Sequence, residues 1–170
     1  GLTNANETVW DGMLIASMSV PSYTLNNSIN GTGITNPSEG IELWNVKNNA
    51  PATITGGNVS NVGTGIFLNN YEGYVSDGGD GAHATITNVT INATTTGVRL
   101  LDSPSSTTHG KVNASVSDCD ITAGVEGIKT EESLAGTTSG SFVDNNIIAG
   151  AVGVNITAMT LSATNTLTID

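Results

Sequence analysis

Four charged residues occupy matching places in two segments of the chain. Arg99 and Lys129 each lie two positions after a glycine, and Asp102 and Glu132 each lie five positions after the same two glycines. If the two segments are neighbouring strands, about 4.8 Å apart, the four side chains lie close together. Basic side chains beside carboxylates can take part in acid–base chemistry, or they can compensate one another's charge on a solvated face. We favour charge compensation and keep the four residues as the alternative catalytic set.

A glycine-rich loop carries a second group of acidic residues. Glu72, Asp77 and Asp80 lie among several glycines in the segment 71–83. Carboxylate oxygens on such a loop can bind calcium, but the segment lacks the regular iteration of a calcium-binding nonapeptide array. A solvated turn is therefore the favoured interpretation. We expect no cofactor, with calcium at these three residues as the alternative.

Asparagines followed at the second position by serine or threonine are candidate N-glycosylation sites. The eight candidates are Asn6, Asn26, Asn30, Asn58, Asn88, Asn92, Asn113 and Asn155. Asn30, Asn58, Asn92 and Asn155 each lie beside an apolar residue, so in a strand they are expected to point outward. Ordinary polar strand positions are the alternative interpretation.

Hydroxyl side chains flank the same apolar position several times. The pairs are Thr53/Thr55, Thr85/Thr87, Ser115/Ser117 and Thr166/Thr168, and Ser28/Asn30 and Ser141/Val143 interrupt the regularity. Stacked strands would turn these pairs into a flat ladder suited to ice or glycans. Threonine is also a favourable outward-facing strand residue. The two alternatives are therefore a face that binds ice or glycans and a set of ordinary strand residues.

The segments that would position these residues repeat a fixed plan. A bulky apolar residue is followed by a second one five positions later and by a glycine eleven positions after the first. The five copies are Ile29/Ile34/Gly40, Ile54/Val59/Gly65, Ile86/Ile91/Gly97, Val116/Ile121/Gly127 and Phe142/Ile147/Gly153. Only the connection between copies varies in length, which is typical of a solenoid built from stacked short strands.

Each glycine opens a short strand, because the residues one and three positions beyond it are nearly always apolar. Units such as Thr64-Gly-Ile-Phe-Leu-Asn-Asn70 and Glu39-Gly-Ile-Glu-Leu-Trp-Asn45 resemble the parallel β-helix repeat (PbH1 type) of the pectate-lyase-like superfamily. The resemblance implies an all-β, right-handed single-stranded parallel β-helix of about six coils. It also implies that a calcium-dependent polysaccharide lyase, with a basic residue as proton abstractor, is the alternative function.

Composition limits the partners. The 170-residue chain has a net charge of −11 with four basic residues, which disfavours nucleic acid or an anionic membrane as a partner. No apolar run is long enough for a membrane span. We expect one β-helix domain over 1–170, with 1–28 as an irregular N-terminal coil that either caps the stack or takes part in assembly. Cys119 is expected to be a small, partly buried filler rather than a reactive thiol.

The ends of the stack decide the predicted function. Leu167-Thr-Ile169 begins a further copy of the plan, and an uncovered stack exposes unpaired strand edges. We therefore expect an extracellular or cell-surface structural or adhesive protein, not an enzyme, that associates head to tail with itself into filaments, with surface glycans as a further partner. The residues assigned to this self-association are Leu2, Val9, Trp10, Leu161, Leu167 and Ile169.

Overall fold

The computed structural model describes residues 10–16, 22–24, 28–33, 37–44, 51–70, 82–102, 111–132, 137–157 and 167–169. Every regular element in these ranges is a β-strand. The strands are β1 (Trp10–Ala16), β2 (Ser22–Thr24), β3 (Ser28–Asn30), β4 (Pro37–Trp44), β5 (Ala52–Thr55), β6 (Asn58–Asn70), β7 (Ala82–Thr87), β8 (Thr90–Asp102), β9 (Lys111–Ser117), β10 (Asp120–Ala123), β11 (Glu126–Glu132), β12 (Thr137–Val143), β13 (Asn146–Ala149), β14 (Val152–Thr157) and β15 (Leu167–Ile169).

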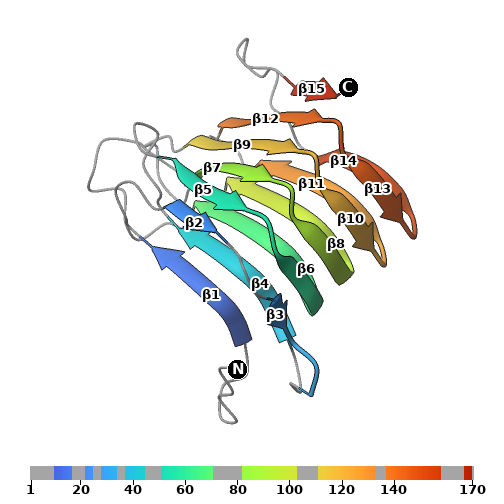
Figure 1. The fold of residues 1–170 in the computed structure, drawn as a ribbon. Coiled ribbons are helices and arrows are strands. Elements are labelled where there is room, and N and C mark those ends of the chain that lie inside the picture. The colour runs from blue at the N-terminus through green and yellow to red at the C-terminus, as the bar shows by residue number, and fades with distance from the viewer. Residues whose placement is uncertain are drawn as a thin grey trace.

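The strands form two parallel sheets that the chain visits alternately. The six-stranded sheet has the order β15-β12-β9-β7-β5-β2, and the nine-stranded sheet follows the path β1-β4-β6-β8-β10-β13, with β3, β11 and β14 paired beside it. Successive turns therefore lie one on top of another along a single axis (Figure 1). This arrangement is a β-solenoid, so the prediction of stacked parallel strands is confirmed.

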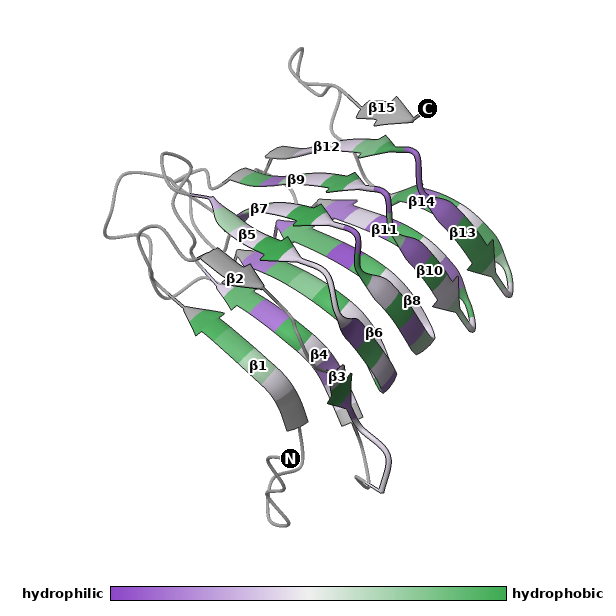
Figure 2. Ribbon diagram, in the orientation of Figure 1, coloured by the Kyte–Doolittle hydropathy of each residue, from purple (hydrophilic) through white to green (hydrophobic). Residues whose placement is uncertain are grey.

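The core is a set of apolar columns between the two sheets. Ile54, Ile86, Val116 and Phe142 are register neighbours in the six-stranded sheet, and each is at most 2% exposed. Equivalent columns of isoleucine, valine and leucine run through the nine-stranded sheet, where hydrophobic and hydrophilic residues alternate along the strands (Figure 2). The period-two pattern of the sequence thus separates a buried face from a solvent-facing one.

The repeated glycines are required by close packing between turns. A Cβ atom at Gly65 would lie 2.3 Å from Ile91 Cγ2 and 2.5 Å from the carbonyl oxygen of Gly97. A Cβ atom at Gly97 would meet Ile121 and Gly127 at the same two distances. The β-branched side chain of each turn therefore occupies the place that a glycine of the preceding turn leaves open.

Left-handed residues make the corner between the two sheets. Asn88, Asp118 and Asp144 have φ angles of 56°, 55° and 54°, and Gly56 at the equivalent corner has 71°. Asparagine, aspartate and glycine are the residues that adopt this conformation at low cost. Backbone hydrogen bonds of 3.0 Å from Gly56 N to Thr87 O and 3.1 Å from Asn88 N to Ser117 O stack these corners.

The predicted register is wrong at both ends of the repeat. Tyr23, not Ile29, pairs with Ile54, and Ile29 pairs with Val59. Ile169, not Leu167, pairs with Phe142. The spacing rule fails in the first copy because additional residues lie between Asn30 and β4, so that an equal spacing in the sequence does not correspond to an equal place in the turn. Residues 10–16 and 22–24, expected to be irregular, form β1 and β2.

The number of coils also differs from the predicted six, because the solenoid has about three turns. In 52–70, 82–102 and 111–132, all strands are paired on both sides. Strands of the flanking copies, such as β13 and β14, pair with another described strand on one side only. The sequence-based prediction counts every copy of the plan as one coil. A copy whose strands are paired on one side only does not form a complete turn of the stack.

Candidate functional site

The charged residues lie on the outward face of the second half of the nine-stranded sheet. The register places Leu14, Glu42, Phe67, Arg99, Lys129 and Asn155 in one column, as the sequence predicts. The neighbouring column, two residues further along, contains Trp44, Asn69, Leu101, Glu131 and Thr157. We call these two columns together the charged face.

Arg99 and Lys129 are neighbours, but their closest carboxylates are Glu131 and Glu126. Arg99 Nε lies 2.6 Å from Glu131 Oε2, and Lys129 Nζ lies 3.0 Å from Glu131 Oε1 and 3.5 Å from Glu126 Oε2. Neither glutamate is among the charged residues predicted from the sequence to lie together. Two positive and two negative charges meet here, which agrees with charge compensation.

Asp102 and Glu132 are register partners of each other in β8 and β11. Asp102 is fully buried, because the fifth position after the glycine falls on the inward side of an alternating strand. The expectation that Asp102 shares an outward surface with Arg99 is therefore wrong. The period-two alternation of the strand by itself predicts that the side chain of Asp102 points inward.

The ion pairs hold both partners in their charged forms. The hydrogen bond from Lys129 to Glu131 raises the pKa of Lys129 against the opposing effect of burial. Burial by itself raises the pKa of Glu131, but the hydrogen bonds from Arg99 and Lys129 outweigh it and lower that pKa. A lysine whose pKa is raised is a poor proton abstractor at neutral pH. The electrostatics therefore disfavour Lys129 as the base of a lyase.

The N-terminal half of the charged face is largely covered. Glu42 is 6% exposed, and its Oε1 accepts hydrogen bonds from Trp44 Nε1 and, at 3.4 Å, from Asn69 Nδ2. The guanidinium of Arg99 lies 4.8 Å from the centre of the Phe67 ring, a cation–π contact. These contacts join the residues of successive turns into one continuous ladder.

The calcium candidates Glu72, Asp77 and Asp80 lie outside the described residues. Within the part of the chain that the structure describes, no three acidic, histidine or cysteine residues gather as metal ligands. Cys119 is buried at 1% exposure, with its Sγ 3.2 Å from the carbonyl oxygen of Ser117. Burial raises the pKa of its thiol. Cys119 is thus more deeply buried than the partly buried filler expected from the sequence.

The hydroxyl residues form a more regular ladder than the sequence predicts. The register aligns Ser22, Thr53, Thr85, Ser115, Ser141 and Thr168 in one column of the six-stranded sheet. Thr24, Thr55, Thr87, Ser117 and Val143 form the second column. Ser22 and Thr24 now take the places assigned to Ser28 and Asn30, because the register of the first copy differs. We call this outward surface the hydroxyl face.

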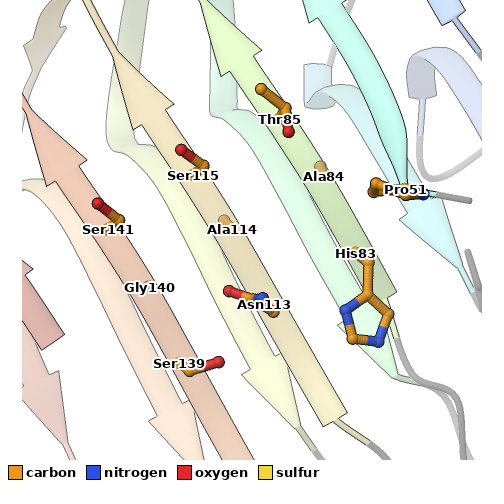
Figure 3. A pocket seen from close by; sticks show the side chains of 10 residues that line it. All are labelled: Pro51, His83, Ala84, Thr85, Asn113, Ala114, Ser115, Ser139, Gly140 and Ser141. Carbon is orange, nitrogen blue, oxygen red and sulfur yellow. The ribbon is translucent and has the colours of Figure 1, made fainter. Parts of the chain in front are cut away.

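A hollow of about 400 Å³ lies on the hydroxyl face. Figure 3 shows Thr85, Ser115 and Ser141 in one row across β7, β9 and β12, with His83, Asn113 and Ser139 in a second row. The described residues that line it are Pro51, His83, Ala84, Thr85, Asn113, Ala114, Ser115, Ser139, Gly140 and Ser141. His83 is only 3% exposed here.

The described glycosylation candidates differ in their surroundings. Asn30, Asn58, Asn88, Asn92 and Asn113 are exposed, and the first four lie on β3, β6 and β8 or at the corner before β8. Asn155 is partly buried and donates from Nδ2 to Glu126 Oε1 at 2.6 Å. The nitrogen that would carry a glycan is thus engaged at Asn155. Asn6 and Asn26 lie outside the described residues.

Among the described strands, none pairs with the outer side of β13 and β14, which form an open edge. Ile156 is 40% exposed, whereas its register neighbour Thr130 in the preceding turn is 3% exposed. Gly127 is packed against Ile147, but a Cβ atom at the equivalent Gly153 would meet no atom within 4 Å. Val152 and Ile148 on the same edge are 41% and 61% exposed. Of the residues assigned to self-association, Leu2, Val9 and Leu161 lie outside the described residues, Trp10 begins β1, and Leu167 and Ile169 delimit β15.

Comparison with known proteins does not assign the chain to a family. No family model, curated protein or solved structure matches it. Among the described residues, no helix has the length and apolar character needed to cross a bilayer.

Proposed function

We propose that this chain is a structural, adhesive β-solenoid of the cell surface that associates end to end with further copies of itself. The observation that carries the proposal is the place left open at Gly153. In four preceding turns, the equivalent glycine (Gly40, Gly65, Gly97 or Gly127) receives the β-branched side chain of the next turn. At Gly127 this side chain is Ile147 of β13, so a strand added beside β13 in parallel register would fill the place at Gly153 in the same way, and a strand added beside β14 would continue the sheet.

The chemistry of the edge supports the proposal. A strand edge presents unpaired backbone groups, and natural proteins usually protect such edges with charges, proline or a covering segment. The edge strands β13 and β14 carry instead Ile148, Val152 and Ile156, each at least 40% exposed. No Asp, Glu, Lys or Arg lies in 145–157. Association through this edge is heterologous and gives a linear assembly.

The surface location and the finer details of the fold belong to the same proposal. The exposed sequon asparagines favour an extracellular setting. A right-handed coil is supported by the strong general preference of parallel crossover connections for that hand. Kinship with the pectate-lyase-like superfamily has the support of the repeat pattern and of the stacked parallel strands.

The test is the assembly state of variants at the open edge. Ile156→Lys places a charge on the inward column of β14, and we expect it to weaken association at least about tenfold. Thr122→Lys is the matched control, because Thr122 is exposed on β10, which is paired on both sides. Light scattering with size-exclusion chromatography measures mass, and negative-stain microscopy shows whether filaments form. A wild-type chain that stays monomeric at high concentration, or an unchanged Ile156→Lys variant, contradicts the proposal.

A further inference from the structure

We infer that the hollow on the hydroxyl face binds a neutral, extended oligosaccharide. This inference goes beyond the end-to-end association, since it concerns a different surface and a different partner. The hollow has a volume of about 400 Å³, which falls within the range of roughly 300–1,000 Å³ typical of small-molecule sites. It lies over β7, β9 and β12, three strands whose pairing fixes the positions of the lining residues.

The lining predicts a neutral ligand. The chain has a net charge of −11, yet none of the described residues that line the hollow is Asp, Glu, Lys or Arg. Among these residues an anionic ligand would find no lysine or arginine, and a cationic ligand would find no carboxylate. The side chains of Thr85, Ser115, Ser139 and Ser141 are hydroxyls that both donate and accept hydrogen bonds, and Asn113 adds an amide that does the same.

The spacing of the lining favours a ligand whose hydroxyl groups repeat. Thr85, Ser115 and Ser141 follow one another across neighbouring strands at about 4.8 Å, and the row of His83, Asn113 and Ser139 lies two residues away at about 6.7 Å. A linear oligosaccharide lying across the strands presents hydroxyl groups from every ring to both rows. Figure 3 shows the two rows side by side on the same surface.

An ice surface is the competing ligand for a hydroxyl ladder, and the shape of this face disfavours it. Ice recognition requires a flat, regularly repeating plane. The surface is hollowed between the row of Thr85, Ser115 and Ser141 and the row of His83, Asn113 and Ser139, and serine replaces threonine at Ser115 and Ser141. The hollow therefore suits an oligosaccharide chain better than the flat surface of an ice crystal.

Titration calorimetry with cellohexaose, maltohexaose and chitohexaose, against hexagalacturonate as the anionic comparison, tests the inference. We expect at least one neutral hexasaccharide to bind and hexagalacturonate to bind at least about tenfold more weakly. Ser115→Lys introduces a charged, bulky side chain into the hollow at an exposed position and should weaken the neutral ligand at least about tenfold. Thr122→Lys on the other sheet should bind as the wild type does.

Several outcomes overturn the inference. These are no binding of any neutral hexasaccharide at millimolar concentration, equal binding of hexagalacturonate, or unchanged affinity in Ser115→Lys. Thermal hysteresis in ice-growth measurements without oligosaccharide binding would assign the face to ice instead. The melting temperature of Ser115→Lys distinguishes lost binding from lost folding, and Ile156→Lys should keep full oligosaccharide binding whether or not it associates.

Discussion

At the residue scale, the spacing between turns is set by glycine and by the β-branched side chain that enters beside it. Four of the glycines, Gly40, Gly65, Gly97 and Gly127, would each place a Cβ atom 2.2–2.3 Å from a valine or isoleucine of the next turn. Real atoms do not approach so closely, so any larger residue there must push two turns apart. The fixed glycine position therefore indicates a contact between neighbouring turns, whose contacting residues lie more than 15 positions apart in the sequence.

This packing predicts different outcomes for the same substitution at two glycines. Gly97→Ala should destabilise the chain by about 3 kcal/mol, because the added methyl group overlaps Ile121 and the Gly127 carbonyl in a packed core. Gly153→Ala should change the free energy of unfolding by no more than about 0.5 kcal/mol, as expected of an open surface position. Urea denaturation of both dilute variants measures the difference. Equal destabilisation would mean that Gly153 is packed against a further turn.

At the element scale, the parallel register aligns the side chains of successive strands in ladders. The charged face joins Arg99 on β8 to Glu131 and Lys129 on β11, and Glu126 continues the contacts to Asn155 on β14. Each pair is only partly buried, with side chains 13–31% exposed. Such pairs contribute modestly to stability but fix which strands lie beside one another.

The lowered pKa of Glu131 predicts a pH dependence of stability. A carboxyl group whose pKa is lower in the folded state stabilises the protein above its unfolded value of about 4.3, and this stabilisation is lost as the pH falls through the lowered folded value. Glu131→Gln should therefore cost about 1 kcal/mol at neutral pH and progressively less in acid. Denaturation at pH 7 and at pH 3 measures this loss.

The control for this prediction is Asp144→Asn, which removes one negative charge at an exposed left-handed corner that asparagine also tolerates. It should show little effect at either pH. If Glu131→Gln destabilises the protein equally at pH 7 and pH 3, its effect is one of packing, and the ion pairs do not stabilise the ladder.

At the scale of the whole molecule, stability should follow the number of neighbours that each turn has. Within the described part of the chain, the turns 52–70, 82–102 and 111–132 are paired on both sides, and the strands β13 and β14 are paired on one side. In a solenoid, the stability of a turn depends mainly on its contacts with the adjacent turns. The middle of the stack should therefore open least often.

Hydrogen exchange measures this gradient. Amides of β6 and β8 should exchange at least about a hundredfold more slowly than those of β13 and β14 in dilute solution, because local opening is easiest where one neighbour is absent. If copies associate end to end, protection of β14 should rise with protein concentration. Uniform protection along the stack at all concentrations would contradict both the open edge and the association through it.

Much of the architecture was predictable from the sequence alone. The alternation of apolar and polar residues, the glycine period and the abundance of Thr, Val, Ile and Asn predict stacked parallel strands, and the column from Leu14 to Asn155 follows from counting positions. These features are local, because a strand alternates its side chains whatever lies beside it. The glycine period also indicates how neighbouring turns pack, since a glycine recurs wherever a side chain of the next turn comes close to the backbone.

Only the tertiary structure decided the register at the ends, the number of complete turns and the partners of the charges. Tyr23 replaced Ile29 beside Ile54 because extra residues lie in a corner, which equal spacing cannot reveal. Glu131 rather than Asp102 faces Arg99 because alternation buries one carboxylate and exposes the other. The hollow on the hydroxyl face arises from three strands and their surroundings together, so no single segment of the sequence encodes it.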